Sequence, residues 1–201
     1  MSSIKLTADS GGGTFEIKAP SSSGNTRVLT LPDTGNITVP DTNGITVHDN
    51  WYVGAGLDPA DGSNVITANW TRDTRTSVGS IGSAMTQSSG LFTFPSTGIY
   101  HIHIAGGFYR NNTDDHKYLG FTIETTVNNG GAYETSNSSY QFLDGLGAYT
   151  YNQVECEFVF DVTDVSQCKA RFKTEAAGSG STVVDIGGRR FSVCFTRLGD
   201  T

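Results

Sequence analysis

The sequence is short of charge and has no long apolar run. Charged residues make up 16% of its 201 residues, against about 25% in an ordinary soluble domain, and only five of them are lysine. The net charge of −7 opposes binding to DNA, RNA or an anionic membrane surface. No stretch approaches the roughly 18 apolar residues of a membrane span, and no apolar signal-peptide core follows Met1. We therefore expect no nucleic-acid partner, no membrane insertion and no signal peptide.

Cysteine is also scarce, with three residues at Cys156, Cys168 and Cys194. An odd number of cysteines without a signal peptide does not fit a secreted disulfide scaffold. No Cys-x-x-Cys pair and no cysteine–histidine cluster has the spacing of a structural zinc site. We therefore expect buried or half-buried thiols, because free cysteine is among the most frequently buried residue types.

Small and hydroxylated residues are present in excess: the chain has 25 glycines and 46 serines and threonines. These residues favour strands joined by tight turns, which argues against a helical bundle. With 36% hydrophobic residues, the chain can still build one sizeable core. The composition changes near residue 50, so we expect an extended N-terminal segment at residues 1–50 and a folded domain at residues 51–201.

The N-terminal segment contains short alternating bursts that end in turn residues. Ile4-Lys5-Leu6 and Phe15-Glu16-Ile17 alternate with the period of a strand. An eight-residue unit then repeats, as Leu29–Asn36 and Ile37–Gly44, and a third copy begins at Ile45. Such a segment buries too little apolar surface to become ordered alone. Two interpretations stay open: a flexible linker, or short strands that pair with copies from neighbouring chains in a three-chain stalk or collar.

The folded domain shows longer strands with one apolar face. After the turn at Pro95–Gly98, alternation places Tyr100, Ile102 and Ile104 on one face of a strand and Ile99, His101 and His103 on the other. We expect Val154–Val162 and Cys168–Lys173 to form a hairpin that carries acidic and basic side chains on one outer face. The predicted core aromatic residues are Phe92, Phe94, Tyr100, Phe158, Phe160, Phe172, Phe191 and Phe195. About eight strands without an amphipathic helix predict an all-β antiparallel sandwich with Greek-key or jelly-roll connections.

Two stretches resemble known families. Phe92-Thr93-Phe94-Pro95-Ser96-Thr97-Gly98-Ile99-Tyr100 is similar to the signature of the C1q/TNF-like jelly roll, and so is the end of the chain, with Gly187-Gly188 before Phe191-Ser192-Val193. This resemblance covers roughly residues 65 to 198 and lacks the collagen-like Gly-X-Y run, so it implies no complement or cytokine function. Leu-Pro-Asp-Thr-Gly at residues 31–35 and Val-Pro-Asp-Thr-Asn-Gly at residues 39–44 resemble N-terminal segments of tailed-phage virion proteins.

Together the two resemblances imply a virion structural protein with a C1q/TNF-like jelly-roll head. It would form a homotrimer, either a capsid-decoration protein or a short fibre, and bind other virion proteins of the capsid or the tail. The residues implied at the trimer interface are Ile99, His101, His103 and Cys194. The residues implied in particle anchoring are Ile4, Leu6, Phe15, Ile17, Leu29, Leu31, Ile37 and Val39.

The histidines of that interface have two interpretations. His101 and His103 of three chains would lie near the threefold axis. There they either form hydrogen bonds with neighbours across the interface, or hold a metal or anion and make the trimer sensitive to acid.

Catalytic motifs are missing from the sequence. There is no Gly-x-Ser-x-Gly elbow, no His-Glu-x-x-His and no phosphate-binding glycine loop, so we expect no enzyme and no cofactor. Glu155, Glu157 and Asp161 could be imagined as glycosidase carboxylates, but their alternation predicts a solvated surface. Asp114 and Asp115 are weak candidates for Ca²⁺ ligands, because they lack the spacing of a calcium loop.

A tyrosine-containing region offers an alternative function. Four tyrosines lie among glycine, serine and asparagine between residues 128 and 152, a composition that suits both sugar stacking and ordinary packing. They are Tyr133, Tyr140, Tyr149 and Tyr151. If they bind a ligand, the domain is a fibre knob that contacts a glycan or protein on the host cell.

Overall fold

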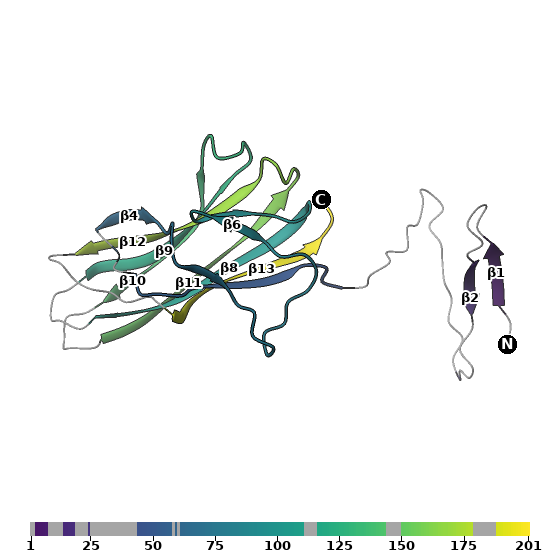
Figure 1. Cartoon of the computed structure of the whole chain (residues 1–201). Coiled ribbons are helices and arrows are strands. Elements are labelled where there is room, and N and C mark those ends of the chain that lie inside the picture. Colours follow the sequence, from purple (N-terminus) through teal and green to yellow (C-terminus); the bar gives the residue numbers. More distant parts are fainter. Residues whose placement is uncertain are drawn as a thin grey trace. The chain divides into compact units, whose positions relative to one another are not determined.

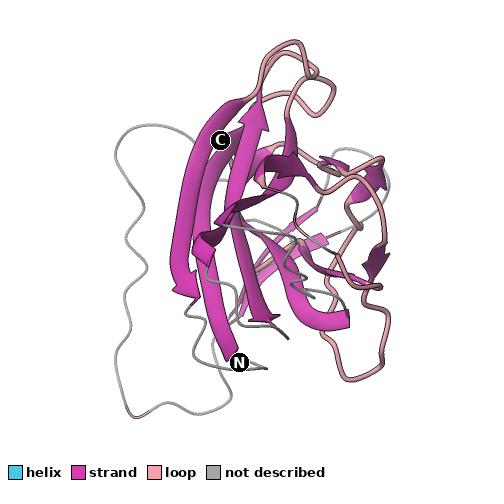
Figure 2. Ribbon diagram, turned by 90° about the vertical axis from the view of Figure 1, so that its left-hand side faces the viewer, coloured by secondary structure: helices cyan, strands magenta, loops and turns pink. Residues whose placement is uncertain are grey.

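The computed structural model describes residues 3–7, 14–18, 24, 44–57, 59, 61–110, 116–143, 150–178 and 188–201. The chain divides into two compact units, Met1–Asp41 and Thr42–Thr201. Every regular element of the described residues is a strand, as Figure 2 shows.

The first unit contains one hairpin. β1 (Ser3–Thr7) and β2 (Thr14–Lys18) pair antiparallel, with Ile4 opposite Ile17 and Leu6 opposite Phe15. The two alternating bursts of the sequence are therefore strands, and each has its partner within the same chain. The other predicted anchoring residues, Leu29, Leu31, Ile37 and Val39, lie outside the described residues.

The second unit consists of two antiparallel sheets (Figure 1). The sheet named here the β9 sheet has the order β10 (Glu134–Leu143), β9 (His116–Thr126), β12 (Lys169–Gly178), β7 (Leu91–Thr93), β6 (Thr86–Ser88), with β4 (Gly62–Val65) also paired to β12. The β8 sheet has the order β11 (Thr150–Val162), β8 (Gly98–Arg110), β13 (Gly188–Gly199), β3 (His48–Val53), β5 (Trp70–Arg72).

The core lies between the two sheets and is rich in aromatic rings. Phe92 of β7 has Trp70, Phe195 and Phe172 around it, at ring-centroid distances of 4.9, 5.2 and 5.4 Å. Each ring comes from a different strand, so the cluster joins both sheets. Of the predicted core aromatic residues all are buried except Phe158, which is half-buried. The all-β sandwich predicted by alternation is confirmed.

One predicted strand pair is wrong. Val154–Val162 and Cys168–Lys173 do not form a hairpin, because β11 pairs with β8 and β12 pairs with β9. The turn between them carries the chain from one sheet to the other, so each strand buries its apolar face in the core from the opposite side. The basic side chains of β12 therefore find a carboxylate on β9: Arg171 Nε lies 2.6 Å and Lys173 Nζ 3.3 Å from the two oxygens of Glu124.

The second unit begins before residue 50. Val47 and Asp49 are 4% and 0% exposed, and β3 pairs with β13 through Thr196 opposite His48. The third copy of the repeat is thus part of the sandwich, and the boundary predicted at residue 50 falls inside β3. The predicted boundary came too late in the chain because the repeat pattern around Val47 is shared with the preceding segment. The side chain of Val47 nevertheless packs in the core of the sandwich.

Candidate functional site

The two faces of the β8 sheet differ sharply in burial. Tyr100, Ile102 and Ile104 on β8 are fully buried in the core, whereas Ile99 and His101 alternate with them and are only half-buried. We call the second side the open face. It carries the outward residues of four strands: Ile99, His101 and His103 of β8; Glu155, Glu157, Val159 and Asp161 of β11; Ser192, Cys194 and Thr196 of β13; His48, Asn50 and Tyr52 of β3.

Three large apolar side chains of β11 and β13 are exposed to solvent. Val159 is 53% exposed and lies across from His101 on the open face. Tyr151 at the start of β11 is 63% exposed and Leu198 near the end of β13 is 57% exposed. Val159 and the half-buried Ile99 lie diagonally across β11 and β8 on the open face, and apolar groups that lie together at a surface mark places where proteins bind partners. The open face is therefore the candidate functional site.

Imidazole–carboxylate contacts run across β8 and β11. His101 Nε2 lies 2.8 Å from Glu157 Oε2, and His103 Nε2 lies 3.5 Å from Glu155 Oε2. The two imidazole rings stack with centroids 6.3 Å apart. The sequence predicted solvated carboxylates here, and their side chains are 66% and 69% exposed for Glu157 and Glu155. Alternation could not predict the contacts, because it does not say that β8 and β11 are neighbours.

The thiol of Cys194 lies on the open face beside the histidines. Cys194 lies opposite His103 in the register of β13 and β8, and its Sγ is 3.7 Å from His48 Nδ1. Burial raises the pKa of Cys194, so the thiol is not activated as a nucleophile. The structure thus brings Ile99, His101, His103 and Cys194, the residues predicted at a trimer interface, together on one face. His48 is an addition that sequence reasoning missed.

A cluster of two arginines and one carboxylate lies at the β5 end of the sheet. Asp73 accepts hydrogen bonds from Arg75 Nε at 2.9 Å and Nη2 at 2.6 Å, and Arg189 Nε lies 3.7 Å away. The hydrogen bonds from Arg75 lower the pKa of Asp73 to about 2. Arg189 also lies over the ring of Tyr52, 5.0 Å from its centroid. These side chains line a cavity of about 230 Å³ that Ser192 and Asn50 reach from the open face. We call Asp73, Arg75 and Arg189 the arginine corner.

A second, larger cavity lies where the sheets meet at β10 and β11. Its volume is about 400 Å³, and its lining is polar: His103, Glu155 and Glu157 from the open face and Asn137 and Ser139 from β10. Asn137 Nδ2 donates to the backbone carbonyl of Glu157 at 2.7 Å, which ties the two sheets together at this edge.

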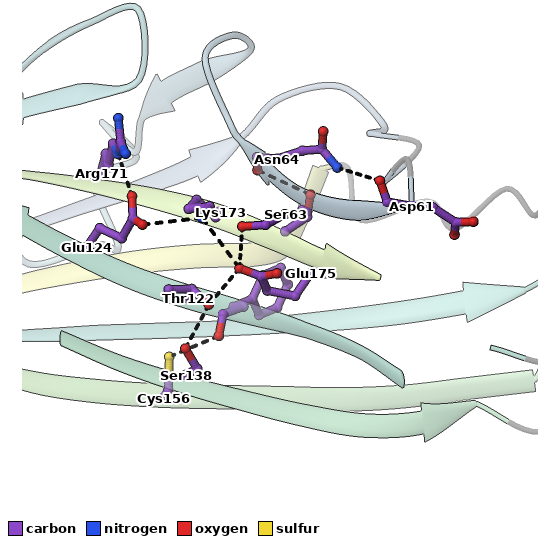
Figure 3. Close-up of polar contacts among 12 residues, drawn as sticks. Asp61, Ser63, Asn64, Thr122, Glu124, Ser138, Cys156, Arg171, Lys173 and Glu175 are labelled. Carbon is purple, nitrogen blue, oxygen red and sulfur yellow. Dashed lines mark hydrogen bonds and ion pairs between the residues drawn. The ribbon is translucent and has the colours of Figure 1, made fainter. Parts of the chain in front are cut away.

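Polar contacts on the outer side of the β9 sheet are structural. Figure 3 shows Glu124 between Arg171 and Lys173, and Glu175 directed at Ser63 and Thr122. Both carboxylates are at most 9% exposed. Because their partners come from β4, β9 and β12, these contacts hold three strands in register.

The candidate tyrosines do not form one site. Tyr133 is half-buried against Arg171, whose guanidinium lies 3.8 Å from the ring centroid. Tyr140 of β10 is 47% exposed and contacts Tyr118 on the β9 sheet, whereas Tyr151 belongs to the β8 sheet and has Tyr109 as its ring partner. The fourth, Tyr149, lies outside the described residues.

The described residues contain no group of three or more histidine, cysteine, aspartate or glutamate side chains that could hold a metal ion. Asp114 and Asp115, the weak calcium candidates, lie outside the described part of the chain. Among the described residues, no helix has the length and apolar character needed to cross a membrane.

Comparison with known proteins identifies the fold. No family model and no curated protein sequence matches the chain. Among solved structures, murine APRIL at pH 8.0 superimposes with a TM-score of 0.52 at 14% identity, covering 76% of this chain and 98% of APRIL. The pH 5.0 structure of murine APRIL gives 0.50 at 16% identity, covering 75% and 99%. The Eiger TNF of S. frugiperda gives 0.48 at 9% identity, covering 77% and 94%. The two APRIL superpositions show that the second unit has a TNF-like jelly-roll fold, as the sequence resemblance implied.

Proposed function

We propose that the chain is a structural protein of a virion, whose jelly roll forms a homotrimer through the open face of the β8 sheet. The observation that supports this proposal is that one side of the β8 sheet packs in a complete core, while the other side carries exposed apolar side chains. The TNF-like fold agrees with it, as does the resemblance of residues 1–50 to attachment segments of phage virion proteins.

Association through the open face would remove apolar surface from water. Burying an exposed valine or leucine side chain stabilises by about 1.5–3 kcal/mol, and each chain offers Val159, Ile99 and Leu198. In a threefold ring every chain makes two contacts, one with each neighbour. Trimerisation also gives three copies of the N-terminal segment, so weak attachment of each segment to the particle is multiplied.

The test of assembly is the mass of the full chain in solution. Sedimentation or native mass spectrometry is expected to give three times the 21.4 kDa of one chain. Val159→Lys should dissociate the trimer, because it places a charge on the exposed apolar part of the open face. Val127→Lys is the matched control: Val127 is 64% exposed after the end of β9, away from that face. A monomeric wild-type chain at micromolar concentration would refute the proposal.

The test of location is electron cryomicroscopy of the particle that carries the chain. The proposal expects knobs with threefold symmetry projecting from the capsid or the tail, joined to it by residues 1–50. Absence of the chain from purified particles would contradict this assignment while leaving the trimer untouched.

A second candidate function is binding of a glycan on the host cell. The observation that favours it is an exposed aromatic patch on the β9 sheet, where Tyr118, Tyr140 and Phe142 are 37%, 47% and 55% exposed. Aromatic rings of this kind stack on sugar rings. A glycan array probed with the full chain tests it, and Tyr140→Ala should abolish a signal that Tyr151→Ala leaves intact.

A further inference from the structure

The open face has opposite charges at its two edges. Glu155, Glu157 and Asp161 are exposed on β11, the first strand of the sheet order. Arg75 follows β5 at the opposite edge, and Arg189 at the start of β13 lies over Tyr52 of β3 on that side; their side chains are 50% and 53% exposed. We call the three carboxylates the acidic edge. β8 and β13 run side by side in Figure 1, with β11 on one side of this pair and β3 and β5 on the other.

The carboxylates of the acidic edge keep capacity for a further cation. Within the chain, Glu157 and Glu155 each contact one imidazole, and both contacts use Oε2. Each side chain remains about two-thirds exposed. A guanidinium from another molecule can therefore reach either carboxylate without breaking the contact to His101 or His103.

The arginine corner has an excess of positive charge, which is complementary to the negative charge of the acidic edge. Asp73 is one carboxylate shared between two guanidiniums, so the corner carries a net positive charge within a chain whose net charge is −7. Because both oxygens of Asp73 accept hydrogen bonds from the guanidinium of Arg75 and the carboxylate also attracts Arg189, it holds both cations at the cavity. Tyr52, Asn50 and Ser192 supply further polar groups to its wall. A cavity of about 230 Å³ admits a carboxylate side chain.

We propose that the acidic edge of one copy of this chain binds in the arginine corner of the next copy. The occupant is a second copy because the cavity opens on the same face as the exposed Val159, so one contact buries apolar surface and pairs charge together. Acidic and basic groups at opposite edges make a head-to-tail contact, and repetition of such a contact closes a ring when the rotation from copy to copy completes a circle. Charge complementarity of this kind sets the register and suppresses incorrect pairings.

This inference rests on the proposed trimer and specifies its contacts. The experiment uses three variants of the full chain: Glu157→Arg, Arg189→Glu and the two combined. Sedimentation velocity over a concentration series gives the dissociation constant of the trimer for each. Each single reversal is expected to weaken assembly at least about tenfold, and the combined variant to return within about threefold of wild type. Raising the salt concentration should weaken the wild-type trimer.

Controls separate the pairing from folding and from the trimer itself. Glu134→Arg reverses an exposed charge at the start of β10, on the other sheet, and should leave assembly unchanged. Recovery in the combined variant shows that Arg189→Glu does not simply unfold the corner beside Asp73. If the wild type is trimeric and both single variants assemble equally well, the pairing is wrong but the trimer stands. The same conclusion follows if the combined variant fails to recover. A monomeric wild type overturns the proposed function instead.

A small anion is the competing occupant of the cavity. In that case sulfate at constant ionic strength would change the thermal stability of wild type but not of Arg189→Glu, while Glu157→Arg would assemble as wild type does. That combination of results would refute the contact between copies.

Discussion

Asp49 offers a sharp test of how the sandwich is stabilised, because it is a carboxylate with no exposure to solvent. Its Oδ1 accepts a hydrogen bond from Arg72 Nε at 2.6 Å. Its Oδ2 accepts from Trp51 Nε1 at 2.8 Å and from the backbone N–H of Met85 at 2.9 Å. One side chain on β3 therefore holds β5 and the segment before β6.

The perturbation is Asp49→Asn, which keeps the shape of the side chain and removes its charge. The amide can present one oxygen and one NH₂ group, so either the guanidinium or the two N–H donors lose their acceptor. Removing one partner of a buried ion pair costs about 3–5 kcal/mol. Arg72 is 32% exposed and can turn toward water, so we expect about 3 kcal/mol, near the lower end of that range.

The assay is equilibrium unfolding in urea at one protein concentration, followed by the fluorescence of the two tryptophans, Trp51 and Trp70. With a slope of about 2 kcal/mol per molar urea, the midpoint should fall by about 1.5 M. Asp61→Asn is the matched control, since Asp61 is exposed and the hydrogen bond from Asn64 is accepted by its backbone carbonyl, which the substitution keeps; it should change stability by less than about 0.5 kcal/mol. If Asp49→Asn also lies within about 0.5 kcal/mol of wild type, the reasoning about this carboxylate is wrong.

Three further outcomes are expected. Gly106→Ala should lower the free energy of unfolding by about 1–3 kcal/mol, because the new Cβ would lie 2.5 Å from the ring of Phe121. Gly107→Ala should be tolerated, because the nearest atom to its new Cβ is 3.9 Å away, and thermal unfolding measures both variants. The pKa of Asp73 is about 2 in the fold, against an ordinary 3.8, so its contribution to stability is present above pH 4 and lost as the pH falls toward 2. Asp73→Asn should therefore flatten that part of a curve of stability against pH. Burial raises the pKa of Cys156 to about 11, so a thiolate-directed reagent at neutral pH should label this thiol only after denaturation, as peptide mass spectrometry would show.

Local patterns predicted the strands well. Alternation of apolar residues depends only on the two faces of a strand, so it correctly assigned Tyr100, Ile102 and Ile104 to the core and Ile99, His101 and His103 to the opposite face. The same reasoning identified β1 and β2 from three residues each. It misjudged the partner of β11, because a short turn after an alternating strand is compatible with a hairpin and with a crossing between sheets.

The arginine corner shows a limit of local reasoning. Asp73 and Arg75 follow a short strand, and Arg189 lies more than a hundred residues later, where a register shift in β13 places it beside Tyr52. No periodic pattern links these residues. The buried Asp49 was missed for a similar reason, since its three hydrogen-bond donors become neighbours only when β3, β5 and the segment before β6 are packed together.

The sequence by itself determined the fold class and the two faces of each strand, because both follow from residue types and their period along the chain. The tertiary structure alone decided which strands are neighbours, and with that the charged contacts of the open face and the position of the arginine corner. The physical reason is that side-chain direction is a property of one strand, whereas distances between charges depend on how strands far apart in the sequence are paired and packed.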